Sequence, residues 1–308
     1  MNLAMIRILL PTLLLCLPGL ASAARWSEPE IAGVVTDRVI SETSGLAASR
    51  NFPGHYWLIN DSGGQARLHL VDGSGRRVGT VDLRGVRNID WEDLASFERD
   101  GKRWLMVADT GDNGGLRREL RLVVLEEPGE LGKAAEPAWT QVFRWPDGAR
   151  DCEAAAVDPV AGQVLLVTKK RVPAELFQVP LDPRPDGSPA VAERLGVLPH
   201  IEQPDARDLE LNPLYGRYRA QVTAADLSPN GRVLAVLNYR AIYFYVREPG
   251  GDWATALSPD RPRQRLWLPW MPQAEGLAFG ADGREIVVGS EQLPSPFVRY
   301  RLIAAPSD

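Results

Sequence analysis

The chain has 308 residues, a formal net charge of −5 at pH 7 and 44% hydrophobic residues. This length and apolar content suffice for a full hydrophobic core, whereas the negative charge argues against a general binder of nucleic acid or of anionic membranes. The 28 glycines and 25 prolines indicate many short strands separated by turns.

The first 23 residues are typical of a signal peptide. Arg7 precedes an apolar run over 8–20, and residues 21–23 read Ala-Ser-Ala, the small-x-small pattern that signal peptidase accepts. A membrane anchor is the rival interpretation, but the run is shorter than the roughly 20 residues that a span needs, and it contains prolines. We therefore expect a periplasmic or secreted protein with no membrane span after cleavage. Residues 24–308 would form a single domain.

One cysteine, Cys152, follows the predicted leader. An intramolecular disulfide is therefore excluded, and packing must stabilise the mature protein even in an oxidising compartment. We expect a buried thiol and a monomer.

In chain order, a strand over 31–36 comes first and five similar units follow. Each unit opens with a strand of small residues, which suits strands crowded round an axis. These first strands are predicted over 44–48, 92–96, 153–157, 223–227 and 275–279. Turn residues and an apolar second strand come next, over 56–59, 104–107, 164–167, 233–236 and 285–288. Third strands with alternating polarity are predicted over 67–71, 121–125, 175–179, 242–246 and 298–302.

A fourth strand is visible in four of the units, over 78–81, 141–145, 191–195 and 264–268. The fifth unit stops at its third strand, and the N-terminal strand over 31–36 can complete it. Such a circular offset closes a ring and leaves no unpaired edge. The pattern predicts an all-β, five-bladed β-propeller whose last blade is closed by the N-terminal strand. A β-sandwich with a loose N-terminal strand is the alternative.

Strand direction places three kinds of segment at one mouth of the central channel. They are the starts of the first strands, the connections from second to third strands, and the connections between blades. The acidic and polar residues at these positions are Glu42, Asp61, Asp90, Glu92, Asp109, Asp112, Asn113, Asp151, Glu153, Thr168, Thr223, Asn238, Glu275 and Glu291. Basic residues accompany them, and the longest loop, 199–221, is expected to cover this mouth as a lid.

So many carboxylates raise one another's pKa unless a counter-charge compensates them. A divalent cation is one solution, and calcium prefers these oxygen ligands. The expected ligands are Glu42, Asp61, Glu92, Asp109, Asp112, Glu153 and Glu275. Zinc is not expected, because the three histidines and Cys152 are not spaced as zinc ligands are. Alternatively, the acids pair with backbone N–H groups, Arg and Lys, and hold the blades together without a metal.

The sequence contains no G-x-S-x-G, no G-x-G-x-x-G after a strand and no P-loop. Metal-assisted hydrolysis stays open, because a bound cation polarises a phosphoryl oxygen and orients water. Glu92, Glu153 and Glu275 are then the candidate catalytic bases. Arg117, Lys169 and Arg240 are the candidate groups that bind the substrate anion. Charge balance for the acidic ring is the alternative role of these basic residues.

Six short stretches carry a resemblance to a known group of proteins. They are Glu42-Thr43-Ser44-Gly45-Leu46, Asn60-Asp61-Ser62-Gly63, Asp90-Trp91-Glu92-Asp93-Leu94, Asp109-Thr110-Gly111-Asp112-Asn113, Thr223-Ala224-Ala225-Asp226-Leu227 and Glu275-Gly276-Leu277. In order and spacing they resemble exported bacterial propellers of the phytase-like esterase and SdiA-regulated type. The resemblance implies a propeller, often metal-associated, with phosphoester or ester hydrolase activity. Thr223 departs from the acidic pattern.

Two functional hypotheses follow. The first is a metal-dependent hydrolase of small anionic esters, with phosphoesters as the leading substrate class. The second is a non-catalytic, metal-stabilised propeller that binds a ligand or a protein partner on this face, since a propeller scaffold serves either role. In both, we expect a small anionic ligand or a protein rather than nucleic acid.

Overall fold

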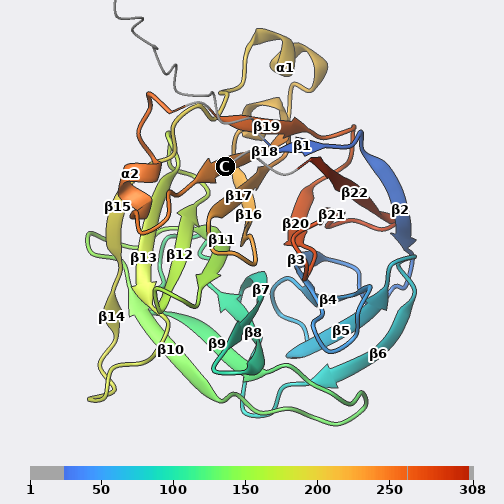
Figure 1. Cartoon of the computed structure of the whole chain (residues 1–308), viewed down its shortest axis with the longest axis vertical. Coiled ribbons are helices and arrows are strands. Elements are labelled where there is room, and N and C mark those ends of the chain that lie inside the picture. The colour runs from blue at the N-terminus through green and yellow to red at the C-terminus, as the bar shows by residue number, and fades with distance from the viewer. Residues whose placement is uncertain (1–23, 262, 305–308) are drawn as a thin grey trace, which may run out of the picture.

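Five small sheets stand round a central axis in the computed structural model, which describes residues 24–261 and 263–304 (Figure 1). Each sheet is a blade whose first strand lies innermost. The fold is an all-β, five-bladed propeller, as predicted, and the described residues add two short α-helices, α1 (Ala206–Leu211) and α2 (Trp253–Ala256). The predicted signal peptide, residues 1–23, lies outside the described residues.

The first two blades cover residues 43–144. Blade one contains β3 (Thr43–Ala48), β4 (His55–Asn60), β5 (Arg67–Asp72) and β6 (Arg77–Asp82). Blade two contains β7 (Trp91–Arg99), β8 (Lys102–Asp109), β9 (Leu120–Glu126) and β10 (Trp139–Arg144). Neighbouring strands of these meanders pair antiparallel.

The remaining blades repeat the meander. Blade three contains β11 (Cys152–Asp158), β12 (Gln163–Thr168), β13 (Glu175–Pro180) and β15 (Glu193–Val197). Blade four contains β16 (Val222–Leu227), β17 (Val233–Asn238), β18 (Ala241–Val246) and β19 (Gln264–Trp267). Blade five contains β20 (Ala274–Phe279), β21 (Glu285–Ser290) and β22 (Ser295–Ala304).

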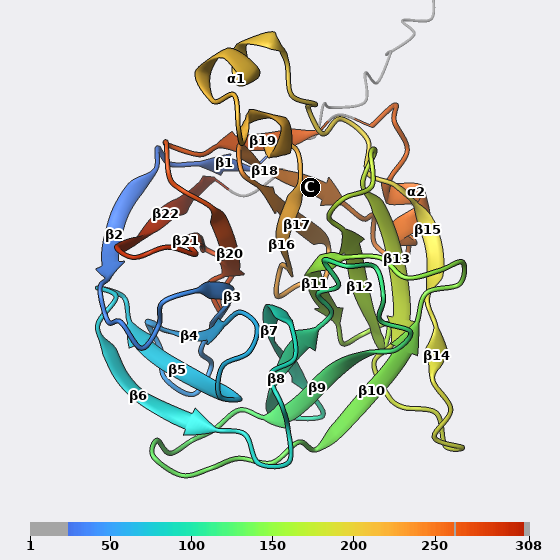
Figure 2. The same ribbon diagram turned by 180° about the vertical axis from the view of Figure 1, so that it is seen from behind.

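The N-terminal segment closes the ring on blade five. Both β1 (Arg25–Trp26) and β2 (Glu30–Val35) pair antiparallel with β22, so the last blade takes its outer strands from the start of the chain. Figure 2 shows β1, β2 and β22 together from behind. The predicted closure by the N-terminal strand is confirmed, and it covers the edge that β22 would otherwise expose.

One predicted strand is divided between two blades. The sequence predicts a single strand over 191–195, whereas the structure has β14 (Ala190–Val191) followed by β15. β14 pairs in parallel with β10 of blade two, and β15 pairs with β13 of blade three. Ala190 and Ala192 are buried against the core between these blades, so packing draws the chain across two outer edges.

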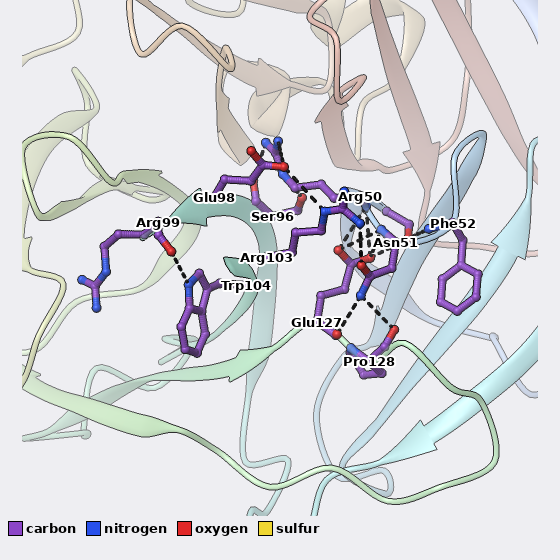
Figure 3. A network of polar contacts seen from close by, with 11 residues as sticks. Arg50, Asn51, Phe52, Ser96, Glu98, Arg99, Arg103, Trp104, Glu127 and Pro128 are labelled. Atoms are coloured by element: carbon purple, nitrogen blue, oxygen red, sulfur yellow. Dashed lines mark hydrogen bonds and ion pairs between the residues drawn. The ribbon is translucent and has the colours of Figure 1, made fainter. Parts of the chain in front are cut away.

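Small residues allow the first strands to crowd round the axis. β3 and β11 are buried along their whole length, and large side chains of the outer strands fill the spaces between blades. A polar network joins blades one and two on the face opposite the acidic mouth (Figure 3). There the buried carboxylate of Glu127 accepts hydrogen bonds from Ser49 Oγ (2.5 Å) and Trp57 Nε1 (2.9 Å).

The helix of the long connection between blades three and four lies outside the ring. Both views place α1 beyond the outer edge of blade four rather than over the central channel (Figures 1 and 2). Asp208 on α1 pairs there with Arg240 and, at 3.6 Å, with Arg219. The expected lid over the mouth is therefore not found. Among the described residues, no helix has the length and apolarity needed to cross a bilayer.

Candidate metal centre

Each of the five first strands carries a β-bulge at the same position, where it leaves the channel mouth. In every blade the pairing of the first with the second strand skips one residue. The five bulged residues are Ser44, Glu92, Glu153, Thr223 and Glu275. All five are buried. A bulge re-aims a side chain, and here it brings three glutamates from different blades to one mouth.

The two bulged hydroxyl residues hold neighbouring blades together. Ser44 Oγ donates a hydrogen bond to the carbonyl oxygen of Trp91 at 2.7 Å. Thr223 Oγ1 donates to the carbonyl oxygen of Ala274 at 2.6 Å. These contacts account for the departure of Thr223 from the acidic pattern, because its side chain bonds to the next blade.

Three carboxylates from blades one and two form the first candidate cation site. Asp61, Asp90 and Glu92 each offer an oxygen within 4.8 Å of the others. Among the described residues, nothing donates a hydrogen bond to the carboxylate of Asp90 or Glu92. The carboxylate of Asp61 accepts one, from its neighbour Ser62 N at 2.5 Å. Unpaired carboxylate oxygens at this spacing are the donor type that calcium takes.

Gly111 makes room for this group. Its N–H donates to the carbonyl oxygen of Asp90 at 3.1 Å, which draws the loop after β8 against the carboxylates. A Cβ at position 111 would collide with Glu92 Oε1 and would lie 2.5 Å from the carboxylate of Asp90. A side chain at position 111 would therefore displace both carboxylates from their present positions.

A second group shares Glu92 with the first. Asp151 and Glu153 offer oxygens within 4.8 Å of one another and of Glu92. Basic and polar donors already neutralise these blade-three carboxylates. Lys169 pairs with Glu153, Lys170 Nζ lies 3.0 Å from Asp151 Oδ2, and the N–H of Asp112 donates to Asp151 Oδ1 at 2.8 Å.

Glu275 has a partner of its own. The Tyr239 hydroxyl donates to Glu275 Oε1 at 2.6 Å. The position after the second strand holds Asp61 in blade one, Lys169 in blade three and Tyr239 in blade four. Aligning the repeats at this position would have found Tyr239, which the sequence analysis missed.

Burial dominates the electrostatics of the mouth. It raises the pKa of Glu92 and Glu153 well above the ordinary range, and neighbouring carboxylates raise both further. Burial, with help from Asp61, raises the pKa of Asp90 to about 6. Burial lowers the pKa of the Lys169 ammonium, but Glu153, Glu275 and Glu92 outweigh it and raise that pKa overall. The carboxyl groups of the mouth are therefore costly to ionise, and a cation held by them would offset that cost.

Two predicted ligands, Asp109 and Asp112, serve the loop after β8 instead. Arg117 lies 2.6 Å from Asp109 Oδ1 and also donates to the carbonyl oxygen of Gly111 at 2.7 Å. Asp112 accepts the backbone N–H groups of Leu116 (2.8 Å) and Arg117 (2.9 Å). Both carboxylates shape the loop that carries Gly111.

Two further predicted residues lie apart from the carboxylate groups. Glu42 is exposed and forms an isolated backbone bridge with Gln292, and its carboxylate belongs to neither group. Arg240 pairs with Asp208 and, at 3.2 Å, with Glu202, in the connection that carries α1. Of the predicted residues, the structure brings together Asp61, Glu92, Glu153, Glu275 and Lys169.

The sequence analysis also missed Asp93, a fully buried carboxylate near the axis. Its Oδ2 accepts the N–H groups of Ala155 (2.8 Å) and Ala225 (3.1 Å), and Oδ1 accepts that of Leu94 (2.8 Å). Asp93 thereby joins the first strands of blades two, three and four. The signal in the sequence is an acid inside a strand of small residues.

No known protein-family model matches the chain, and no curated protein matches it in sequence. Solved structures with a similar arrangement share 12% identity each. One chain of a nidogen/laminin complex gives a TM-score of 0.44 over 82% of this chain and 73% of that chain. Hydrazine synthase of Kuenenia stuttgartiensis gives 0.42 over 83% and 70%. The Cps50 (Swd1) β-propeller domain of Myceliophteria thermophila gives 0.40 over 85% and 65%.

Proposed function

We propose that this protein is a calcium-dependent hydrolase of small anionic esters, with phosphoesters as the favoured substrate class. The observation that supports this proposal most directly is that only some of the carboxylates at the mouth have partners. Asp90 and Glu92 have no hydrogen-bond donor among the described residues, whereas the blade-three and blade-five carboxylates are paired with Lys169 and Tyr239. The site that lacks a counter-charge is the site for a cation.

Asp61, Asp90 and Glu92 would hold the cation. Three carboxylates supply up to six oxygens, which approaches the coordination number of calcium. Ionising all three in a buried site costs free energy that a divalent cation offsets. When bound, the cation would polarise an ester oxygen and lower the pKa of water beside it.

Lys169, Glu153 and Glu275 would act on the substrate. The Lys169 ammonium lies between carboxylates of blades three and five, where it can pair with an anionic ester oxygen. Glu153 and Glu275 are then the proton acceptors, because burial keeps the pKa of each above its ordinary value. Glu92 is assigned to cation binding, since it belongs to both carboxylate groups.

The cation is tested first, on the predicted mature chain purified without added ions. We expect about one calcium ion per chain and a lower melting temperature in chelator, because a ligand that binds only the folded state stabilises it. Glu92→Gln should abolish the chelator effect, while Glu119→Gln, an exposed acid in the same group of loops, should keep it. Metal-free protein whose melting temperature is indifferent to calcium and chelator would reject the cation.

Activity is tested separately, with phosphomonoester, phosphodiester and carboxyl-ester substrates in calcium and then in chelator. We expect calcium-dependent turnover that falls by roughly a hundredfold or more in Glu153→Gln. Bound calcium without turnover of any substrate would reject the hydrolase and leave the cation site standing.

A specific observation supports a second candidate, a non-catalytic propeller that binds a ligand or a protein partner at this mouth. Two of the three candidate bases already have partners, Glu153 in Lys169 and Glu275 in Tyr239. In that case the ion pair and hydrogen bond stabilise the channel, and Glu153→Gln would lower the melting temperature with no activity to lose.

A further inference from the structure

We propose that the mouth face docks on an anionic lipid surface through a ring of exposed loop tips. Among the large apolar side chains exposed on this face, five from the loops of blades one, two, three and five are called the rim residues: Val39, Ile89, Leu116, Val172 and Trp270. Trp270 is 89% exposed, Leu116 83% and Val172 73%. A single exposed apolar side chain is ordinary on a protein surface, but several that accompany unpaired basic residues on the loops of one face are the combination found at membrane-binding surfaces.

Strand direction places all five rim residues on the face of the acidic mouth. Val39, Ile89 and Trp270 lie in the connections that lead into β3, β7 and β20, the first strands of blades one, two and five. Leu116 and Val172 lie in the connections from second to third strands of blades two and three. The rim therefore draws on five different loops of one face.

Unpaired arginines accompany the apolar tips. Arg38 adjoins Val39, Arg87 lies two residues before Ile89, Arg118 lies two residues after Leu116, and Arg171 adjoins Val172. All four arginines are exposed. Within the part of the chain that the structure describes, none of their side chains forms a hydrogen bond or an ion pair.

This combination fits an anionic lipid surface better than a rigid protein partner. The tips are single side chains on separate loops, and a fluid interface adapts to separated tips. Arginines bind lipid phosphates while apolar side chains enter the acyl boundary, and tryptophan favours that interface. Charge complementarity at the rim therefore favours an anionic bilayer.

The acids of the mouth do not oppose this docking as strongly as the net charge of the chain implies. Glu92, Asp151 and Glu153 are buried, and Lys169 and Lys170 pair with two of them. The free arginines, in contrast, are at the surface. Glu42 and Glu119 are exposed on the same face, so burial removes part of the negative charge from this surface and not all of it.

The test is co-sedimentation of the predicted mature chain with vesicles of phosphatidylcholine and phosphatidylglycerol in equal parts, compared with phosphatidylcholine alone. Chelator is present throughout, so that calcium neither bridges protein to lipid nor makes the result depend on the proposed cation site. We expect binding to the anionic vesicles that weakens as salt rises. Arg118→Gln with Arg171→Gln should weaken it about thirtyfold, since each basic residue near anionic lipid contributes about fivefold.

Trp270→Ala should weaken vesicle binding by about tenfold or more. The matched controls lie on the opposite face: Val160→Ala, whose side chain is 90% exposed in the connection from β11 to β12, and Arg184→Gln in the connection after β13. Both controls should bind as the parent does. Absence of binding to anionic vesicles, or equal losses in rim and control variants, would overturn the proposal and leave a protein partner for this face.

Discussion

Glu92 is the residue that connects the two halves of the candidate metal centre. Its carboxylate belongs to both acidic groups, and no described residue donates a hydrogen bond to it. Its position comes from the bulge in β7, between Trp91 and Asp93. Cation binding should therefore be sensitive to single substitutions close to Glu92.

Gly111→Ala tests whether space beside Glu92 limits cation binding. The added Cβ would collide with Glu92 Oε1 and crowd Asp90, so we expect calcium affinity to fall by at least about tenfold, roughly 1.4 kcal/mol. Isothermal titration calorimetry measures it. Gly114→Ala is the control, because its Cβ would meet only the side chain of Leu116, at 3.4 Å. Equal affinities of both variants and the parent would contradict the placement of the cation.

The pH dependence of the cation-free protein tests the buried acids. Burial raises the pKa of Asp90 from 3.8 to about 6 and that of Glu291 from 4.5 to about 7. The folded state then holds protons that the unfolded state has released, so the free energy of unfolding should fall as pH rises from about 4 to about 7. Urea denaturation in chelator across this range measures it.

Asp90→Asn should flatten the lower part of this pH window, and Glu291→Gln the upper part. Calcium affinity should rise over the same range, because the ligands must ionise to bind. Stability that rises with pH between about 4 and 7 in chelator would show that these carboxyls are not destabilised by burial.

At the scale of elements, the repeated strand unit was predictable and the details of its edges were not. Small residues in the first strand and apolar residues in the second recur five times, so period and composition identify the meander. The bulges could not be predicted from period and composition, because they depend on how the residues of neighbouring strands pair. The division of 191–195 between β14 and β15 likewise follows from burial of Ala190 and Ala192 against a neighbouring blade.

The closing strand β2 offers a comparison within one element. Val35 is fully buried in the core between blades one and five, whereas Ile31 is exposed. Val35→Ala should lower the free energy of unfolding by about 2 kcal/mol, and Ile31→Ala by less than about 0.5 kcal/mol. Chemical denaturation measures both. Equal effects would mean that β2 does not seal the ring as described.

At the scale of the whole molecule, Asp93 joins three blades at the axis. Asp93→Ala would leave the N–H groups of Ala155 and Ala225 without their acceptor inside the ring. We expect a loss of about 3 kcal/mol in the free energy of unfolding. Asp93→Asn should cost less, because burial raises the pKa of Asp93 and an amide oxygen still accepts. A smaller loss in the alanine variant than in the asparagine variant would contradict this role.

The sequence by itself determined the fold class, the five units, the closing N-terminal strand and the face on which the acids gather. Those features depend on periodicity and strand direction, which are local properties. Only the tertiary structure decided which acids meet. Asp61, Asp90 and Glu92 meet although they come from two loops and a bulge. Asp109 instead pairs with Arg117, and Asp112 accepts hydrogen bonds from the backbone of its own loop. Side-chain direction at a mouth depends on pairing and burial across blades.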